Sequence, residues 1–130
     1  MRLAPVPDSA AKARAFVERT LCNWGCRELV DDARVVVTEL VSNVVRHAGT
    51  DVGVDLDLDA VRHRVRIDVV DHAGGDVALR RGDPAFDLGG RGLRLVDELS
   101  ERWGVERRPG GKCVWAEWAV GAGARHSAPA

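Results

Sequence analysis

The sequence carries almost no net charge and no long apolar stretch, and both absences restrict its function. Its 19 Lys and Arg side chains nearly balance 20 Asp and Glu side chains, which leaves a formal net charge of −1. Proteins that bind nucleic acid or anionic membranes usually carry a basic excess. No apolar run approaches the roughly 20 residues that span a bilayer, and the first residues lack the apolar core of a secretory signal. We therefore expect a cytoplasmic protein that binds neither nucleic acid nor membrane directly.

Cysteine is also scarce. The three cysteines, Cys22, Cys26 and Cys113, are an odd number and include no Cys-x-x-Cys pair. This pattern argues against a disulfide framework and against a cysteine zinc site. The four histidines are scattered without the spacing of metal ligands. We expect small, buried, free thiols in a reducing compartment.

Several common catalytic motifs are missing. The segment nearest to a Walker loop, Gly110-Gly111-Lys112-Cys113, lacks the first glycine and the hydroxyl of that motif. Gly90-x-Gly92 lacks the third glycine of a dinucleotide-binding fingerprint. Ser42 and His47 lie five residues apart on one predicted helix, so their side chains diverge and no hydrolase pair is expected.

The composition and periodicity that are present are typical of one α+β domain. At 130 residues, with 45% hydrophobic and 30% charged residues, the chain can bury a sizeable core. Apolar spacings of three to four and of two residues distinguish the expected helices from the expected strands. In chain order we expect a short strand, helices over 8–24 and 27–48, strands over 52–59 and 61–71, a loop over 72–90, a helix over 92–103, and strands over 104–107 and 112–120.

This order predicts a two-layer α/β sandwich with helices on one face of a mixed or antiparallel sheet. Residues 1–120 would form the single domain and residues 121–130 a disordered tail. Asp8 or Ser9 is expected to cap the first helix, and Gly25 and Gly49 are expected to end the first two. Val61 would be on the inward face of its strand.

Three polar features interrupt these apolar patterns. Glu39, Asn43 and His47 form a stripe along the second helix. Asp71 ends an apolar strand and is followed by Gly74 and Gly75, and glycines over 89–92 open the third helix. Each feature alone is compatible with a purely structural role, as a solvated helix face, an ordinary turn or a tight helix entry.

Together, the three features fit a nucleotide phosphate site. Backbone N–H groups at Gly90-Arg91-Gly92 can face an anion at a helix N-terminus, and Arg91 adds positive charge. The carboxamide oxygen of Asn43 is a suitable Mg²⁺ ligand, and Glu39 could polarise an attacking oxygen one turn away. Asp71 could accept a hydrogen bond from the exocyclic amine of adenine, and residues 74–89 would cover the nucleotide as a lid.

In this order the features resemble the histidine-kinase-like ATPase superfamily, with its Bergerat-type ATP-binding fold. Residues 39–48, ELVSNVVRHA, are close to its N box, residues 70–75 correspond to its first glycine box, and residues 90–96, GRGLRLV, match its second. Residues 103–105 and 110–115 resemble its closing hairpin. Within the superfamily the chain looks most like the small stand-alone relatives of anti-sigma-factor serine/threonine kinases that are abundant in actinobacteria.

The resemblance implies a role for each matching residue. It makes Glu39 the catalytic base, Asn43 the Mg²⁺ ligand and Asp71 the adenine anchor. It extends the ATP contacts to the remaining N-box and glycine-box positions: His47, Gly75, Gly90, Arg91, Gly92 and Leu93. His47 is equally compatible with a role at the helix end.

Two positions depart from the family pattern. The first glycine box usually reads Asp-x-Gly-x-Gly, but Ala73 stands at its first glycine here. The threonine often found near the last strand is absent from Gly111-Lys112-Cys113. An added methyl group beside a ligand lowers the binding free energy by about 1–3 kcal/mol when neighbouring atoms must move. We therefore expect the departure at Ala73 to weaken the affinity for ATP.

Three functions remain open. The first is an ATP- and Mg²⁺-dependent kinase that phosphorylates an anti-sigma-factor antagonist protein and sequesters a sigma factor, and relatives' pairing would imply a homodimer. The second is a nucleotide-sensing or nucleotide-free binding module without transfer. The third is an interaction domain whose glycines serve folding alone. We expect no topoisomerase, chaperone or sensor histidine kinase, because each needs a further domain.

Overall fold

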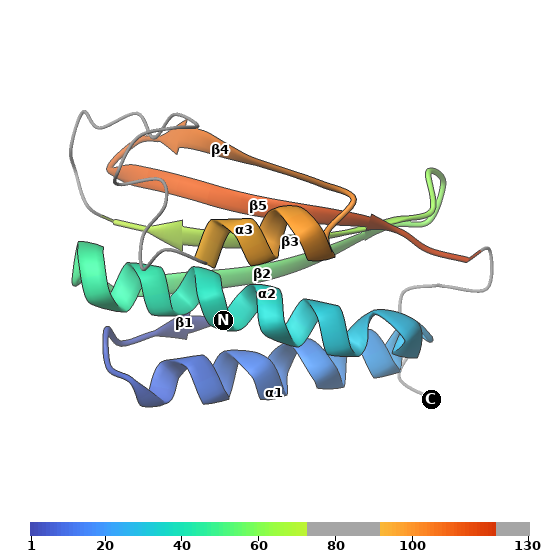
Figure 1. The fold of residues 1–130 in the computed structure, drawn as a ribbon, viewed down its shortest axis with the longest axis horizontal. Coiled ribbons are helices and arrows are strands. Elements are labelled where there is room, and N and C mark those ends of the chain that lie inside the picture. The colour runs from blue at the N-terminus through green and yellow to red at the C-terminus, as the bar shows by residue number, and fades with distance from the viewer. Residues whose placement is uncertain (73–91, 122–130) are drawn as a thin grey trace.

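The computed structural model describes residues 1–72 and 92–121. In this part of the chain, helices cover one face of an antiparallel five-stranded sheet (Figure 1). The elements are β1 (Arg2–Leu3), α1 (Asp8–Asn23), the 3₁₀ turn η1 (Arg27–Leu29), α2 (Val30–Asn43), the π-helical turn η2 (Val44–Ala48), β2 (Val52–Asp59), β3 (Arg64–Asp71), α3 (Gly92–Leu99), β4 (Arg102–Arg108) and β5 (Gly111–Ala119). The predicted two-layer α+β sandwich is confirmed, and the sheet is antiparallel.

The strands follow the order β1-β2-β3-β5-β4 across the sheet. The predicted hairpin is formed by β2 and β3, and a second hairpin is formed by β4 and β5. At one end of the sheet Val52, Asp71 and Lys112 lie side by side on β2, β3 and β5. The register therefore places the predicted adenine anchor next to a lysine on the neighbouring strand.

Helix α2 lies in the middle of the helical layer, because it packs against both α1 and α3 (Figure 1). Its inward face is apolar and fully or almost fully buried, and it lies over the valines and isoleucine of β2 and β3. These buried residues are Val36, Val37, Leu40 and Val41 on α2 and Val52, Val54, Val65, Ile67 and Val69 on the sheet. The core thus holds α2 in a fixed orientation, which decides where its polar stripe lies.

The end of α1 is as predicted, but its beginning is not. Gly25 has a φ of 75°, and its N–H donates to the Cys22 carbonyl while Cys26 N–H donates to Leu21. These two bonds form a Schellman motif. The predicted capping role of Asp8 or Ser9 is wrong, because the helix starts after Pro7 and the Ser9 hydroxyl donates to the preceding Ala4 carbonyl.

The predicted helix over 27–48 has the expected extent but an irregular beginning and end. It opens with the 3₁₀ turn η1 and closes with the π-helical turn η2. Gly49, with a φ of 63°, ends it as predicted, and its N–H donates to the Val44 carbonyl five residues back. The wider final turn changes the direction of the side chains that follow Asn43.

The position of Val61 is a correction. It lies in the β2–β3 turn and its side chain is 89% exposed, so it is not on the inward face of a strand. The Asp59 carboxylate accepts hydrogen bonds from the N–H groups of Val61 and Arg62. This local turn stabilised by an aspartate competes with strand extension.

Helix α3 is shorter than predicted, because it ends at Leu99 and Trp103 belongs to β4. The Leu99 carbonyl accepts a hydrogen bond of 2.7 Å from the Trp118 indole, which satisfies a group at the helix end. The Trp103 indole donates to Asp97 at 2.6 Å. These tryptophans join the end of α3 to the second hairpin.

The cysteines are free thiols, as expected. Cys26 and Cys113 are buried and Cys22 is half-buried. Burial is the main reason that the pKa of the Cys113 thiol rises to about 12. Within residues 1–72 and 92–121 no helix combines the length and apolarity needed to cross a bilayer. Almost all of the predicted loop, from residue 73 onward, and residues 122–130 of the predicted tail lie outside the described residues.

Candidate functional site

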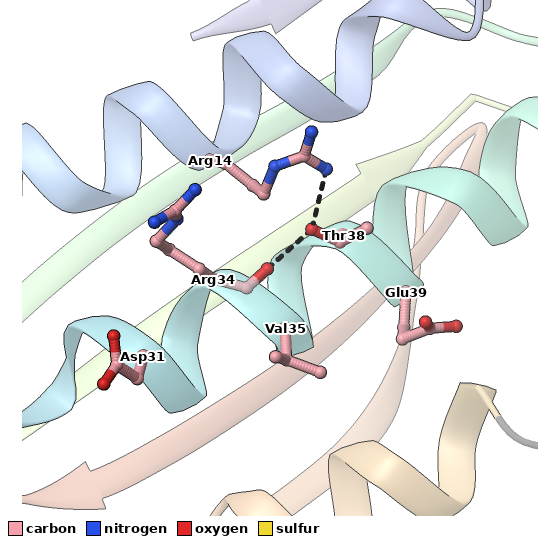
Figure 2. Close-up of a pocket in the computed structure, with 6 residues that line it drawn as sticks. All are labelled: Arg14, Asp31, Arg34, Val35, Thr38 and Glu39. Carbon is pink, nitrogen blue, oxygen red and sulfur yellow. Dashed lines mark hydrogen bonds between the residues drawn. The ribbon is translucent and has the colours of Figure 1, made fainter.

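The polar stripe of the sequence lies on the second half of the α2–η2 helix. Glu39 is half-buried, Asn43 is 9% exposed and His47 is exposed. A separation of four residues places Glu39 and Asn43 about 6 Å apart along the helix axis, on the same side. Figure 2 shows that Glu39 projects from the side of α2 that faces away from α1 and toward α3. The fold therefore presents the two groups together at the border between core and surface.

Asn43 is held by a basic residue of the following turn. Arg46 Nη2 donates a hydrogen bond of 3.1 Å to the Asn43 carboxamide oxygen. The two residues are three apart, and the helix changes to a π-helical turn directly after Asn43. π-Helical turns inside helices frequently occur at functional sites. The oxygen that was predicted to bind Mg²⁺ thus lies next to a guanidinium, and this bond fixes its direction.

Asp71 lies at the end of β3 with its side chain 1% exposed. Its Oδ1 accepts a hydrogen bond of 3.2 Å from the Lys112 backbone N–H, and its Oδ2 is hydrogen-bonded to the Lys112 ammonium. The carboxylate is charge-paired, buried and aimed from the sheet toward the helical layer.

A short connection brings Asp71 to the same end of the molecule as the end of α2–η2. Only Gly49, Thr50 and Asp51 separate η2 from β2, and the first residue of β2, Val52, pairs with Asp71. The His72 N–H donates a hydrogen bond of 3.1 Å to the Thr50 hydroxyl. The segment that follows the α2–η2 helix and the segment that follows Asp71 are therefore directly bonded.

Gly111 allows the backbones to approach closely at this end of the sheet. A Cβ atom on Gly111 would overlap the carbonyl oxygen of Asp71 and crowd the Cα of His72. No L side chain fits there without movement of the backbone. Gly111 therefore contributes to the position of Asp71, a role that its sequence context alone did not indicate.

The third predicted component is partly described. Helix α3 starts at Gly92, as predicted, and packs against α2. Leu93 is 4% exposed and belongs to the core, so only its backbone, in the first helical turn, is suited to meet a ligand. Gly75, Gly90 and Arg91 lie outside the described residues, and their proposed phosphate contacts remain predictions.

Two partners in the site were missed by sequence reasoning. Lys112 was noted in the sequence without any link to Asp71, and its pairing with Asp71 depends on the β3–β5 register. The bond between Arg46 and Asn43 could have been found, because residues three apart on a helix are neighbours. No group of three or more His, Cys, Asp and Glu side chains among the described residues could hold a metal ion.

The geometry agrees with the comparison to protein families. The family model described as the histidine kinase-like ATPase domain matches residues 3–118. A search of curated proteins gave no match. The matched range covers almost the whole chain and contains Glu39, Asn43, Asp71 and Gly92. The chain belongs to the family of histidine kinase-like ATPase domains, whose name implies ATP as the nucleotide.

Proposed function

We propose that this protein is an ATP-dependent serine/threonine kinase of the anti-sigma-factor type. It would transfer the γ-phosphoryl group of ATP to a small antagonist protein and would also sequester a sigma factor. The observation that carries the proposal is the position of Glu39 and Asn43 one helical turn apart on α2, within the range that the family model matches. A carboxylate one turn from a carboxamide supplies a base next to a metal ligand, which is what transfer to a hydroxyl requires.

The residues at the site fit Mg²⁺. The Asn43 oxygen is a hard donor, and its Arg46 partner is an exposed side chain that can move away at little cost. Mg²⁺ in phosphoryl-transfer sites is usually held by one or two protein oxygens together with water and phosphate oxygens. Asn43 would hold the ion, which when bound supplies positive charge against the phosphates.

The protein groups have distinct tasks in this proposal. Asp71 accepts a hydrogen bond from the exocyclic amine of adenine and so positions the base. The first turn of α3, with backbone N–H groups that have no partner within the helix, attracts the phosphates. Glu39 accepts the proton of the serine or threonine hydroxyl. The hydroxyl oxygen bonds to the γ-phosphorus while the bond between the γ-phosphorus and the ADP oxygen breaks. Positioning and charge stabilisation supply most of the rate enhancement in such reactions.

Transfer of ³²P from labelled ATP to candidate antagonist proteins tests the proposal. We expect labelled antagonist with the wild-type protein and a loss of at least 100-fold with Glu39→Ala, because general-base catalysis typically contributes about 10²–10⁴-fold. Glu98→Ala, an exposed carboxylate on α3, is the matched control and should retain the wild-type rate. Transfer that is unchanged in Glu39→Ala, or absent with every candidate antagonist, would reject the kinase.

A nucleotide-binding regulator without transfer is the second candidate. It is favoured by Ala73, which replaces a glycine of the first glycine box. Calorimetry with ATP and ADP separates the alternatives. Binding that is abolished by Asp71→Asn or Asn43→Ala, together with no transfer, would support the regulator. No binding by the wild-type protein would leave a nucleotide-free module.

A further inference from the structure

A hollow of about 450 Å³ lies on the outer surface of the helical layer, over α2 and beside α1. Figure 2 shows its six lining residues, of which only Arg14 comes from α1. The lining residues are Arg14, Asp31, Arg34, Val35, Thr38 and Glu39. The hollow is open to solvent along α2 and has Glu39 at one end, so a chain segment can lie in it.

Arg14 is a half-buried cation without a carboxylate partner in the described part of the chain. Its Nη1 donates a hydrogen bond of 3.1 Å to the Thr38 hydroxyl, which in turn donates to the Arg34 carbonyl at 2.6 Å. Arg34 differs, since its guanidinium lies 3.4 Å from the Glu18 carboxylate. A guanidinium offers five N–H donors in a planar fork that matches a carboxylate. Arg14 therefore has capacity for an anionic group, and Thr38 fixes its position.

The remaining part of the hollow is suited to a different kind of contact. Val35 is 39% exposed, an unusual exposure for a valine on a helix whose other face forms the core. It lies one turn before Glu39, so its side chain and the Glu39 carboxylate share one side of α2. An apolar side chain of a partner can rest on Val35 while a neighbouring group reaches Glu39.

Glu39 is the one residue that belongs both to the hollow and to the N-box stripe. Asn43, on the nucleotide side, lies one turn further along the helix, away from Asp31, Arg34 and Arg14. A hydroxyl that enters through the hollow would therefore approach Glu39 along α2 from the end away from Asn43. Phosphoryl transfer depends on such positioning of the acceptor hydroxyl next to its base.

We propose that the hollow is the docking site for the acceptor segment of the protein substrate, an extended segment that carries a carboxylate. Arg14 binds the carboxylate, Val35 contacts an apolar side chain, and the serine or threonine hydroxyl reaches Glu39. This inference rests on the proposed function and specifies the substrate class, an acceptor hydroxyl in an acidic sequence.

Fluorescence anisotropy with short labelled peptides tests the docking site without requiring transfer. The probes are two sets of 15-residue peptides, each with one central serine. In the first set a single glutamate is placed in turn at each position from five residues before the serine to five residues after it. In the second set a lysine replaces that glutamate. We expect the best glutamate peptide to bind the wild-type protein, with ADP and Mg²⁺ present, about tenfold more tightly than its lysine counterpart, since hydrogen bonds between charged groups are the strong ones.

Substitutions at one position of α1 then identify the contact. Arg14→Gln should remove the preference for glutamate, and Arg14→Glu should reverse it toward the lysine peptide. Arg19→Gln, an exposed arginine on the same helix outside the hollow, should leave the preference unchanged. Thermal melting of each variant confirms that it is folded, and the reversed preference of Arg14→Glu cannot be produced by partial unfolding.

The outcomes separate the docking site from the kinase. Charge-dependent peptide binding that requires Arg14, combined with no phosphoryl transfer, would retain the docking site and reject the kinase. Transfer with a glutamate preference that survives Arg14→Gln would retain the kinase and overturn the docking site. No peptide binding, or equal effects of Arg14→Gln and Arg19→Gln, would also overturn it.

Discussion

Replacing Lys112 with methionine should destabilise the protein substantially, although the sequence assigned Lys112 no role in the site. The substitution keeps most of the side-chain length and removes the ammonium group from the Asp71 carboxylate. Asp71 is 1% exposed, whereas the Lys112 side chain is 28% exposed. The variant must therefore hold a buried carboxylate without the Lys112 ammonium, and the backbone N–H of residue 112, which donates to Oδ1, is the contact from this residue that remains.

The magnitude follows from the burial of the pair. Removal of one partner from a fully buried ion pair costs about 3–5 kcal/mol. Because the ammonium side is partly solvated and the backbone donor remains, we expect about 2–3 kcal/mol for Lys112→Met after discounting for screening. In a domain of this size, each kcal/mol lowers the melting temperature by about 4 °C. Urea unfolding followed by circular dichroism gives the free energy, and calorimetry gives the melting temperature.

A double-mutant cycle with Asp71→Asn separates the pair from the lost packing of the lysine stem. The carboxamide of Asp71→Asn needs no cation, so Lys112→Met should cost less than 1 kcal/mol in that background. Asp71→Asn alone and the double variant with Lys112→Met should both lose ATP binding. If Lys112→Met costs the same in both backgrounds, the ion pair contributes nothing measurable and our reading of the site is wrong.

Three further predictions concern the same end of the molecule and the cysteines. Gly111→Ala should weaken ATP binding at least tenfold by calorimetry and destabilise the fold by about 1–3 kcal/mol, because its Cβ must displace the Asp71 carbonyl; a variant with wild-type affinity would contradict this. Asn43→Ala should abolish the Mg²⁺ dependence of ATP affinity, whereas retention of that dependence would exclude Asn43 as the ligand. Burial raises the pKa of Cys113 to about 12, so at pH 8 Cys113 should react with a thiol reagent only on unfolding. The half-buried Cys22 should react first, and rapid labelling of Cys113 in the folded protein would contradict this prediction.

The sandwich was predictable because its determinants are local. The period-two pattern of β2 and β3 and the helical spacing on α2 each arise from burial of one face, which neighbouring residues reveal. Gly25 and Gly49 were recognisable for a similar reason, since each adopts a positive φ at a helix end. The predicted polar stripe is real in the structure, because the buried face of α2 leaves Glu39 and Asn43 at its border.

The errors in prediction arose where tertiary contacts overrode local preference. Trp103 continues the helical spacing of α3, but its indole and that of Trp118 bond to the end of that helix from the hairpin, so the helix stops at Leu99. The partnership of Lys112 with Asp71 was equally hidden. It depends on which residue of β5 lies opposite the end of β3, and a shift of one residue would place Lys112 on the other face.

The two hidden partners give the site a property that its motifs do not imply. Asn43 and Asp71 would be costly to bury without hydrogen bonds, and each is bonded to a long basic side chain, Arg46 or Lys112. Both arginine and lysine have flexible stems, so each can release or share its acceptor when a ligand arrives. The exposed Arg46 can leave Asn43 at little cost, but Lys112 is bound to a buried carboxylate and must stay. In the proposed function, the base of a nucleotide would add to the Asp71–Lys112 pair, whereas the metal would replace Arg46. These two events should respond differently to salt, because screening weakens the exposed Arg46 contact far more than the buried pair.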